Sequence, residues 1–143
     1  MRKYKNIFFG LMLVMVAGCE DAVELATPNV ASPVLVLLEG SSFSSGARVE
    51  VVGTFLELDK TGILDKNIGI DSIPLSNLEI IVFVDHVQEV SSLVTDPTGK
   101  AALSLTWADL GISPATSGNQ VKLEFAGMHK GIPFRKYHTI RVQ

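Results

Sequence analysis

The side chains best suited to chemistry in this 143-residue chain are one cysteine, Cys19, and three histidines, His86, His129 and His138. A cysteine thiolate is a strong nucleophile, and a histidine can move a proton or bind a metal near neutral pH. No histidine has an HExxH spacing or a cysteine close by, so a zinc site would need carboxylate ligands. The pattern predicts a turn position for His86, a loop position for His129 and a strand face for His138. It predicts no catalytic, metal or cofactor site.

Cys19 lies where an apolar segment ends and the first acidic residues begin, in the stretch VMVAGCED. The chain has basic residues at positions 2, 3 and 5, an almost wholly apolar run at 7–16, and then the small residues Ala17 and Gly18. This order is typical of a secretory signal peptide, and the run is shorter than the roughly 20 residues that a membrane-spanning helix needs. A surface helix packed on a core would carry a polar face, which this run lacks. The sequence therefore predicts a cleaved signal peptide over residues 1–18.

Within that class, Val16-Ala17-Gly18-Cys19 resembles the lipobox of bacterial lipoproteins. The resemblance implies that the thiol of Cys19 receives a diacylglycerol thioether, that the signal is cut just before Cys19, and that the new amino group is acylated. Cys19 is thus the expected lipidation site. Each buried methylene contributes about 0.8 kcal/mol, so two or three chains of palmitate length hold a protein on a membrane.

The acidic residues Glu20 and Asp21 follow the expected lipid site directly. In lipoproteins of the Bacteroidota group, acidic residues there resemble a signal for surface display, whereas in enteric bacteria they favour retention at the inner membrane. We expect an outer-membrane location, on the periplasmic face or at the cell surface.

Three of the 12 Lys and Arg residues precede Cys19, which leaves nine against 15 Asp and Glu in the mature chain. An acidic protein with no basic run argues against a nucleic-acid partner. Residues 20–32 (EDAVELATPNVAS) are typical of a tether, so the lipidated cysteine and tether together would occupy positions 19–32. The alternative is that these residues are the frayed start of the domain. Thirteen extended residues span at most about 45 Å. Residues 33–143 are enough for one hydrophobic core.

The remainder of the chain carries the signals of strands. Short apolar or alternating runs are separated by turn residues at 33–38, 48–51, 78–84, 87–95, 100–107, 121–125 and 134–142. Residues 59–72 are the least regular and predict a long loop or a loose edge strand, and 110–114 hold one helical turn at most. About seven strands with frequent turns and no amphipathic helix predict an all-β sandwich.

Two local features refine this prediction. Gly53 is expected to bulge or bend its strand, because glycine in a strand often marks such a site. In Thr95-Asp96-Pro97-Thr98-Gly99-Lys100, Asp96 can bond the backbone ahead, Pro97 presets φ and Gly99 accepts a left-handed conformation. A type I turn followed by such a glycine predicts a hairpin with a bulge.

Three segments also carry a family resemblance: VGT at 52–54, IPLSNLEIIV at 73–82 and VTDPTGKAAL at 94–103. In this order they resemble the carboxypeptidase regulatory-like, or prealbumin-like, domains and equally the bacterial immunoglobulin-like domains. The chain departs from the pattern in the insertion between Thr54 and Ile73, in Asn77-Leu78 where Gly-Ala is usual, and at Lys100. The resemblance implies a sandwich that serves as an envelope, adhesion or accessory module.

Trp107, the sole tryptophan, shares the parity of the apolar residues Leu103 and Leu105, which predicts a core position. The alternative is a platform on which a sugar stacks, and that would need exposed partners such as Tyr137 or Phe134.

Two further patterns are weak. Asp59 and Asp65 flank Gly62 as in a calcium loop, but without alternating oxygen ligands, so a solvated loop is expected there. Asp71-Ser72-Ile73 resembles an O-glycosylation acceptor of Bacteroidota.

The sequence as a whole predicts a non-catalytic, lipid-anchored cell-envelope protein that binds, adheres to or scaffolds other envelope proteins or surface glycans. Two alternatives stay open. A surface lipoprotein that captures carbohydrate or another ligand would present two or more coplanar exposed aromatic rings. An enzyme would need a pocket that gathers His129 or His138 with carboxylates.

Overall fold

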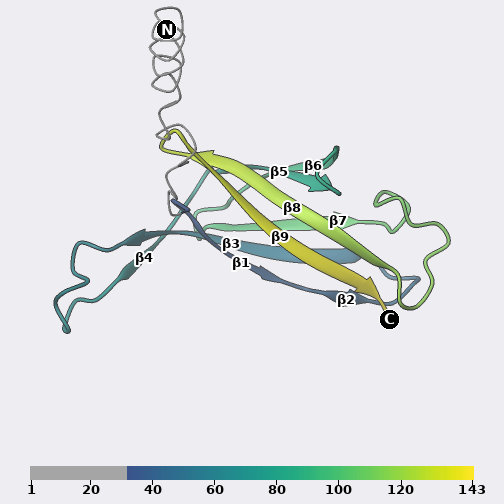
Figure 1. The fold of residues 1–143 in the computed structure, drawn as a ribbon, viewed down its shortest axis with the longest axis horizontal. Helices are drawn as coiled ribbons and strands as arrows, with labels where there is room; N and C mark the ends of the chain where they lie inside the picture. The colour runs from purple at the N-terminus through teal and green to yellow at the C-terminus, as the bar shows by residue number, and fades with distance from the viewer. Residues whose placement is uncertain (1–31) are drawn as a thin grey trace, which may run out of the picture. The chain divides into compact units, whose positions relative to one another are not determined.

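The computed structural model describes residues 32–143, which form an all-β, sandwich-like unit of two sheets (Figure 1). Within this part of the chain every regular element is a strand. The nine strands are β1 (Leu35–Glu39), β2 (Ser42–Phe43), β3 (Val49–Asp59), β4 (Asp71–Pro74), β5 (Glu79–Val84), β6 (Gln88–Val94), β7 (Lys100–Leu105), β8 (Gln120–His129) and β9 (Ile132–Val142). The expected signal peptide and tether, Cys19 included, lie outside the described residues.

The first sheet is organised around the long strand β3. Strand β1 pairs along one side of β3, and both β7 and β4 pair along the other, all antiparallel. The first half of β3, up to Thr54, pairs with β7, and the second half, from Leu56, pairs with β4. β3 is therefore shared by two consecutive partners on the same side.

The second sheet has the order β2-β9-β8-β5-β6, antiparallel except for the short parallel pair of β2 with β9. The chain passes from the first sheet to the second between β1 and β2. Gly40 makes this crossing with φ +92°, and a Cβ there would lie 2.4 Å from the carbonyl oxygen of Glu50. Only glycine fits a left-handed residue so close to a neighbouring strand.

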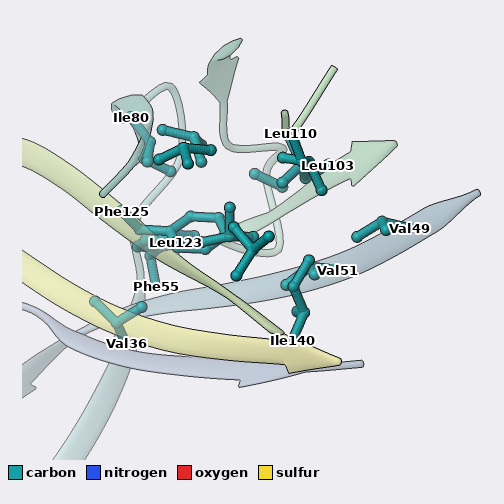
Figure 2. Packing of buried hydrophobic residues seen from close by; sticks show 14 of the residues in the cluster. Val36, Val49, Val51, Phe55, Ile80, Leu103, Leu110, Leu123, Phe125 and Ile140 are labelled. Carbon is teal, nitrogen blue, oxygen red and sulfur yellow. The ribbon is translucent and has the colours of Figure 1, made fainter. Parts of the chain in front are cut away.

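The core lies between the two sheets, because alternate residues of strands such as β3, β5 and β7 point inward (Figure 2). Phe55, Leu103, Ile80, Leu123 and Phe125 are among its fully buried side chains. Each such side chain contributes about 1.5–3 kcal/mol relative to an exposed one.

Trp107 is 4% exposed and belongs to this core, as its parity predicted. Its indole Nε1 donates a hydrogen bond to the carbonyl oxygen of Ser44 at 3.1 Å, which satisfies the polar group of a buried ring.

The structure confirms the strands predicted from alternation and corrects two local predictions. Register runs without a break past Gly53 in the pairing with both β1 and β7, so the expected bulge is absent. The glycine is needed for packing, because a Cβ there would lie 2.6 Å from Cε2 of Phe55. The two-residue strand β2 lies in the Gly- and Ser-rich stretch 40–46, between two predicted strands, where the sequence predicted no strand.

The second correction concerns the turn at 95–100. Its chemistry is as predicted: Gly99 N donates to Asp96 O at 2.9 Å, Asp96 Oδ1 accepts from Thr98 N at 2.7 Å, and Gly99 has φ +74°. The predicted hairpin is wrong, however, because β6 pairs in the second sheet and β7 in the first. The turn is a corner that carries the chain between sheets.

This corner meets β3 at the point where its partners change. Phe55 N donates to Gly99 O at 2.8 Å, and Phe55 O accepts from Leu75 N at 3.0 Å. The buried hydroxyl of Thr95 donates to Leu75 O at 2.5 Å and accepts from Leu78 N at 2.9 Å. We refer to Phe55, Leu75, Leu78, Thr95 and Gly99 as the β3 junction.

A pair of alanine substitutions tests the junction. Gly99 and Gly111 have φ of +74° and +78°, so alanine at either position costs roughly 1–2 kcal/mol of backbone strain. At Gly111 the added methyl meets open space, whereas at Gly99 it would lie 2.6 Å from Phe55 O. We expect Gly99→Ala to lower the free energy of unfolding by about 1–3 kcal/mol more than Gly111→Ala, measured by urea denaturation. Equal losses would show that the close approach of Gly99 to β3 is unimportant.

Candidate binding surface

A hairpin arm projects from the sandwich at the end of β3 (Figure 1). It comprises residues 56–74: the second half of β3, the loop 60–70 and strand β4. Leu56 to Asp59 pair with Pro74 to Asp71, and all four residues of β4 are exposed. The sequence-based expectation of a long loop or loose edge strand at 59–72 is confirmed in this form.

The loop at the tip of the arm is built by its own hydrogen bonds. Four of its N–H groups, those of Ile63, Asp65, Ile68 and Gly69, donate to carbonyl oxygens of the same loop at 2.9–3.1 Å. Two more, those of Thr61 and Asn67, donate to side-chain oxygens of Asp59 and Asp65 at 2.9 and 2.8 Å. The hairpin tip therefore has a defined conformation.

The two aspartates that suggested a calcium loop serve this tip instead. Hydrogen bonds from Thr61, the backbone N–H first, hold the pKa of Asp59 below its usual range. Asp65 forms the equivalent bond to Asn67. Each carboxylate thus stabilises a turn as an Asx residue does.

The tip presents aliphatic side chains to solvent. Leu64 is 99% exposed, Ile68 68% and Ile63 55%, and Ile70 and Ile73 are exposed nearer the base. Ile68 also packs on the bare Cα of Gly62, where a Cβ would lie 2.3 Å from its Cγ2. Scattered exposed apolar residues are normal, but a group on one ordered projection is typical of an interaction site.

The base of the arm is tied to the second sheet by charges. Glu57 Oε2 accepts a hydrogen bond from Nε2 of His129 at 3.0 Å, and its Oε1 forms an ion pair with Lys130. The bonds from Lys130 and then from His129 hold the pKa of Glu57 below its usual value of 4.5. His129 is the last residue of β8 and pairs with Ile132 in β9. Its predicted loop position is therefore wrong, although the loop begins at the next residue.

The first described strand starts beside this base. Leu35, at the beginning of β1, is the register partner of Leu56, which is also the partner of Pro74 in the arm. The chain therefore enters the sandwich next to the point where the arm leaves it.

The other two histidines lie elsewhere. His86 occupies the β5–β6 turn, as predicted, with a left-handed φ of +67°, and its Nδ1 bonds to Glu124. Glu124 points away from the core but is only 3% exposed, because the side chains of His86 and Arg135 cover it. Nε of Arg135 lies 3.2 Å from Oε1 of Glu124. His138, on a face of β9 as predicted, donates from Nε2 to Gly40 O at 2.7 Å.

The structure does not bring the predicted aromatic partners together. Phe134 is buried, and the centroid of its ring lies 6.2 Å from that of Phe55. Tyr137 is the only exposed aromatic residue between 32 and 143. Its ring is contacted edge-on by His86, with centroids 5.0 Å apart, and Nζ of Lys122 lies 4.3 Å from its centroid.

Ser72, in the glycosylation-like stretch Asp71-Ser72-Ile73, lies exposed in β4 on the arm. Residues 32–143 contain no group of three or more His, Cys, Asp or Glu placed to hold a metal ion. In the same range no helix is long and apolar enough to cross a bilayer. No protein-family model, curated protein or solved structure matches the chain.

The sequence predicted a loop or edge strand where the arm lies, but not its exposed aliphatic surface, and it gave no indication of the buried carboxylate Glu124. A usable signal for the arm was present, since Ile63, Leu64, Ile68 and Ile70 are aliphatic residues in a segment whose glycines and charges predict a loop. For Glu124 there was none, since its partner His86 is 38 positions away.

The Glu57 tie leads to a prediction about pH. A carboxylate whose pKa is lower in the folded state stabilises the fold above its unfolded pKa, and this contribution is lost as pH falls through the folded pKa. At pH 7 we therefore expect Glu57→Gln to lower the melting temperature and speed amide hydrogen exchange in residues 56–74. The difference in melting temperature between the variant and the wild type should shrink as the pH falls below 4.5, the usual pKa of a glutamate.

Glu50→Gln is the matched control, because Glu50 is an exposed glutamate of the same strand that takes part in none of the ion pairs formed within residues 32–143. A Glu57→Gln difference that stayed constant between pH 7 and pH 3 would contradict the electrostatic tie.

Proposed function

We propose that this protein is a non-catalytic lipoprotein of the bacterial envelope, anchored through Cys19, whose β-sandwich acts as a binding or scaffolding module. The anchor rests on the lipobox-like Val16-Ala17-Gly18-Cys19 after a basic and apolar leader. The binding role is carried by one observation, the ordered arm with its exposed aliphatic tip. Other envelope components are the partners that this location offers.

The arrangement of strands supports an immunoglobulin-like sandwich. In that fold strands A, B and E share one sheet and C, F and G share the other, with C′ added beside C. Here β1, β3 and β7 take the places of A, B and E, and β5, β8 and β9 those of C, F and G, with β6 beside β5. The arm is then an insertion between B and C, the same place at which the sequence departs from the family pattern.

The placement of the histidines also fits a binding module better than a catalytic one. Each is committed to a different structural partner: His86 to Glu124, His129 to Glu57 and His138 to the carbonyl of Gly40. These three pairs stabilise a turn, the arm base and a strand crossing.

The anchor is tested by replacing the lipid-accepting thiol. Cys19→Ser should abolish incorporation of labelled palmitate and leave the leader attached, because the serine hydroxyl is a far weaker nucleophile than a thiolate. Metabolic labelling, the mass of the purified protein and its N-terminal sequence measure this. The proposal fails if the variant keeps the wild-type N-terminus and still extracts with the membrane fraction.

Ser45→Ala serves as a control for expression and export, because Ser45 is an exposed residue in the β2–β3 loop. It should be processed and labelled as wild type is.

A further inference from the structure

We propose that the tip of the arm inserts into the surface of the bilayer to which the protein is anchored, with Ile63, Leu64 and Ile68 as the inserted side chains. This inference rests on the proposed lipid anchor and adds a second point of membrane contact to it.

The chemistry of the tip suits lipid better than a protein partner. Its exposed apolar side chains, Ile63, Leu64 and Ile68, are all aliphatic. The loop that carries them lies at the end of a hairpin (Figure 1). Protein interfaces are typically dominated by aromatic and arginine anchors that fill matching pockets, and loop 60–70 contains none of these residues. A bilayer requires only apolar surface and imposes no matching shape.

Part of the backbone of the tip is already hydrogen-bonded within the protein. Polar backbone groups that enter lipid need partners within the protein, since lipid chains supply none. Six N–H groups of the loop already have them, four in loop carbonyls and two in Asp59 and Asp65.

The charges of the loop are compatible with a membrane surface. Loop 60–70 carries Lys60, Lys66 and one aspartate, Asp65, within a mature chain of nine basic and 15 acidic residues. Lysine stems can lie along apolar surface while the ammonium groups stay among lipid head groups. Asp65 is held by its bond to Asn67.

The length of the chain before the domain allows this contact. From Leu56 to Leu64 the chain has eight peptide steps and spans at most about 29 Å, and Leu35 is the register partner of Leu56. The thirteen residues 20–32 span at most about 45 Å when extended. The tether is therefore long enough for the tip to reach the bilayer that holds Cys19, and the chain enters on the side of the arm.

The test uses the full-length lipidated protein in vesicles of phosphatidylethanolamine and phosphatidylglycerol, with no other protein present. An environment-sensitive thiol probe is placed by Leu64→Cys, and in a matched variant by Ser117→Cys in the loop between β7 and β8. Both positions are exposed, so neither substitution disturbs the core. A lipidated Cys19 carries a thioether and does not react with the probe.

We expect spin-labelled lipids to quench most of the fluorescence at position 64, with a blue shift, and to leave position 117 unchanged. If the protein floats with the vesicles and neither probe is quenched, the tip proposal is overturned and the anchor stands. A blue shift at 64 without quenching by lipid would mean contact with a second copy of the chain, which also overturns it. Probe uptake by the wild-type protein, together with failure to float, would show a free Cys19 thiol and overturn both proposals.

Discussion

The fold depends on the two backbone hydrogen bonds of Phe55. Its N–H bonds to the corner before β7 and its C=O to the residue after β4, so one residue holds the ends of two strands against β3. Its ring is fully buried and lies against the bare Cα of Gly53. Backbone groups in a core must find partners, and here their partners define where the sandwich ends and the arm begins.

The junction lets the arm be exposed without weakening the sandwich. Inward-facing residues of β3 up to Phe55 join a core of 20 buried apolar side chains, whereas Leu56 to Asp59 are only partly buried. Each aliphatic side chain left in water forfeits about 1.5–3 kcal/mol of burial. A loop that keeps four of them exposed yet hydrogen-bonds its own backbone is a feature for which folding alone gives no reason. This is why we propose the arm, rather than a face of the sandwich, as the binding surface.

The sequence predicted what is decided locally. Alternation identified the strands, and the Asp96 to Gly99 turn was correct down to its hydrogen bonds, because turn chemistry needs only neighbouring residues. The assignment of β6 and β7 to one hairpin was wrong because sheet membership is decided by distant contacts, such as those of Thr95 with Leu75 and Leu78. The hydrogen bond between Glu57 and His129 could not be predicted for the same reason, since the two residues are 72 positions apart in the sequence. The bulge expected at Gly53 was wrong because glycine at this position makes room for the ring of Phe55, a contact that no periodicity reveals.

An anchor and a weakly binding tip act together more strongly than either does alone. If a lipid on Cys19 holds the chain at the membrane, as we propose, contact of the tip with the same bilayer would be an intramolecular event, with an effective concentration of roughly millimolar for a short linker. Three aliphatic side chains can then suffice, although they would not hold a free protein on a membrane. Two points of contact also restrict rotation of the domain, which a tether alone leaves free. The ion pairs of Glu57 with His129 and Lys130 link the arm to the second sheet. In the proposed arrangement, an arm held in the bilayer would therefore orient the whole sandwich.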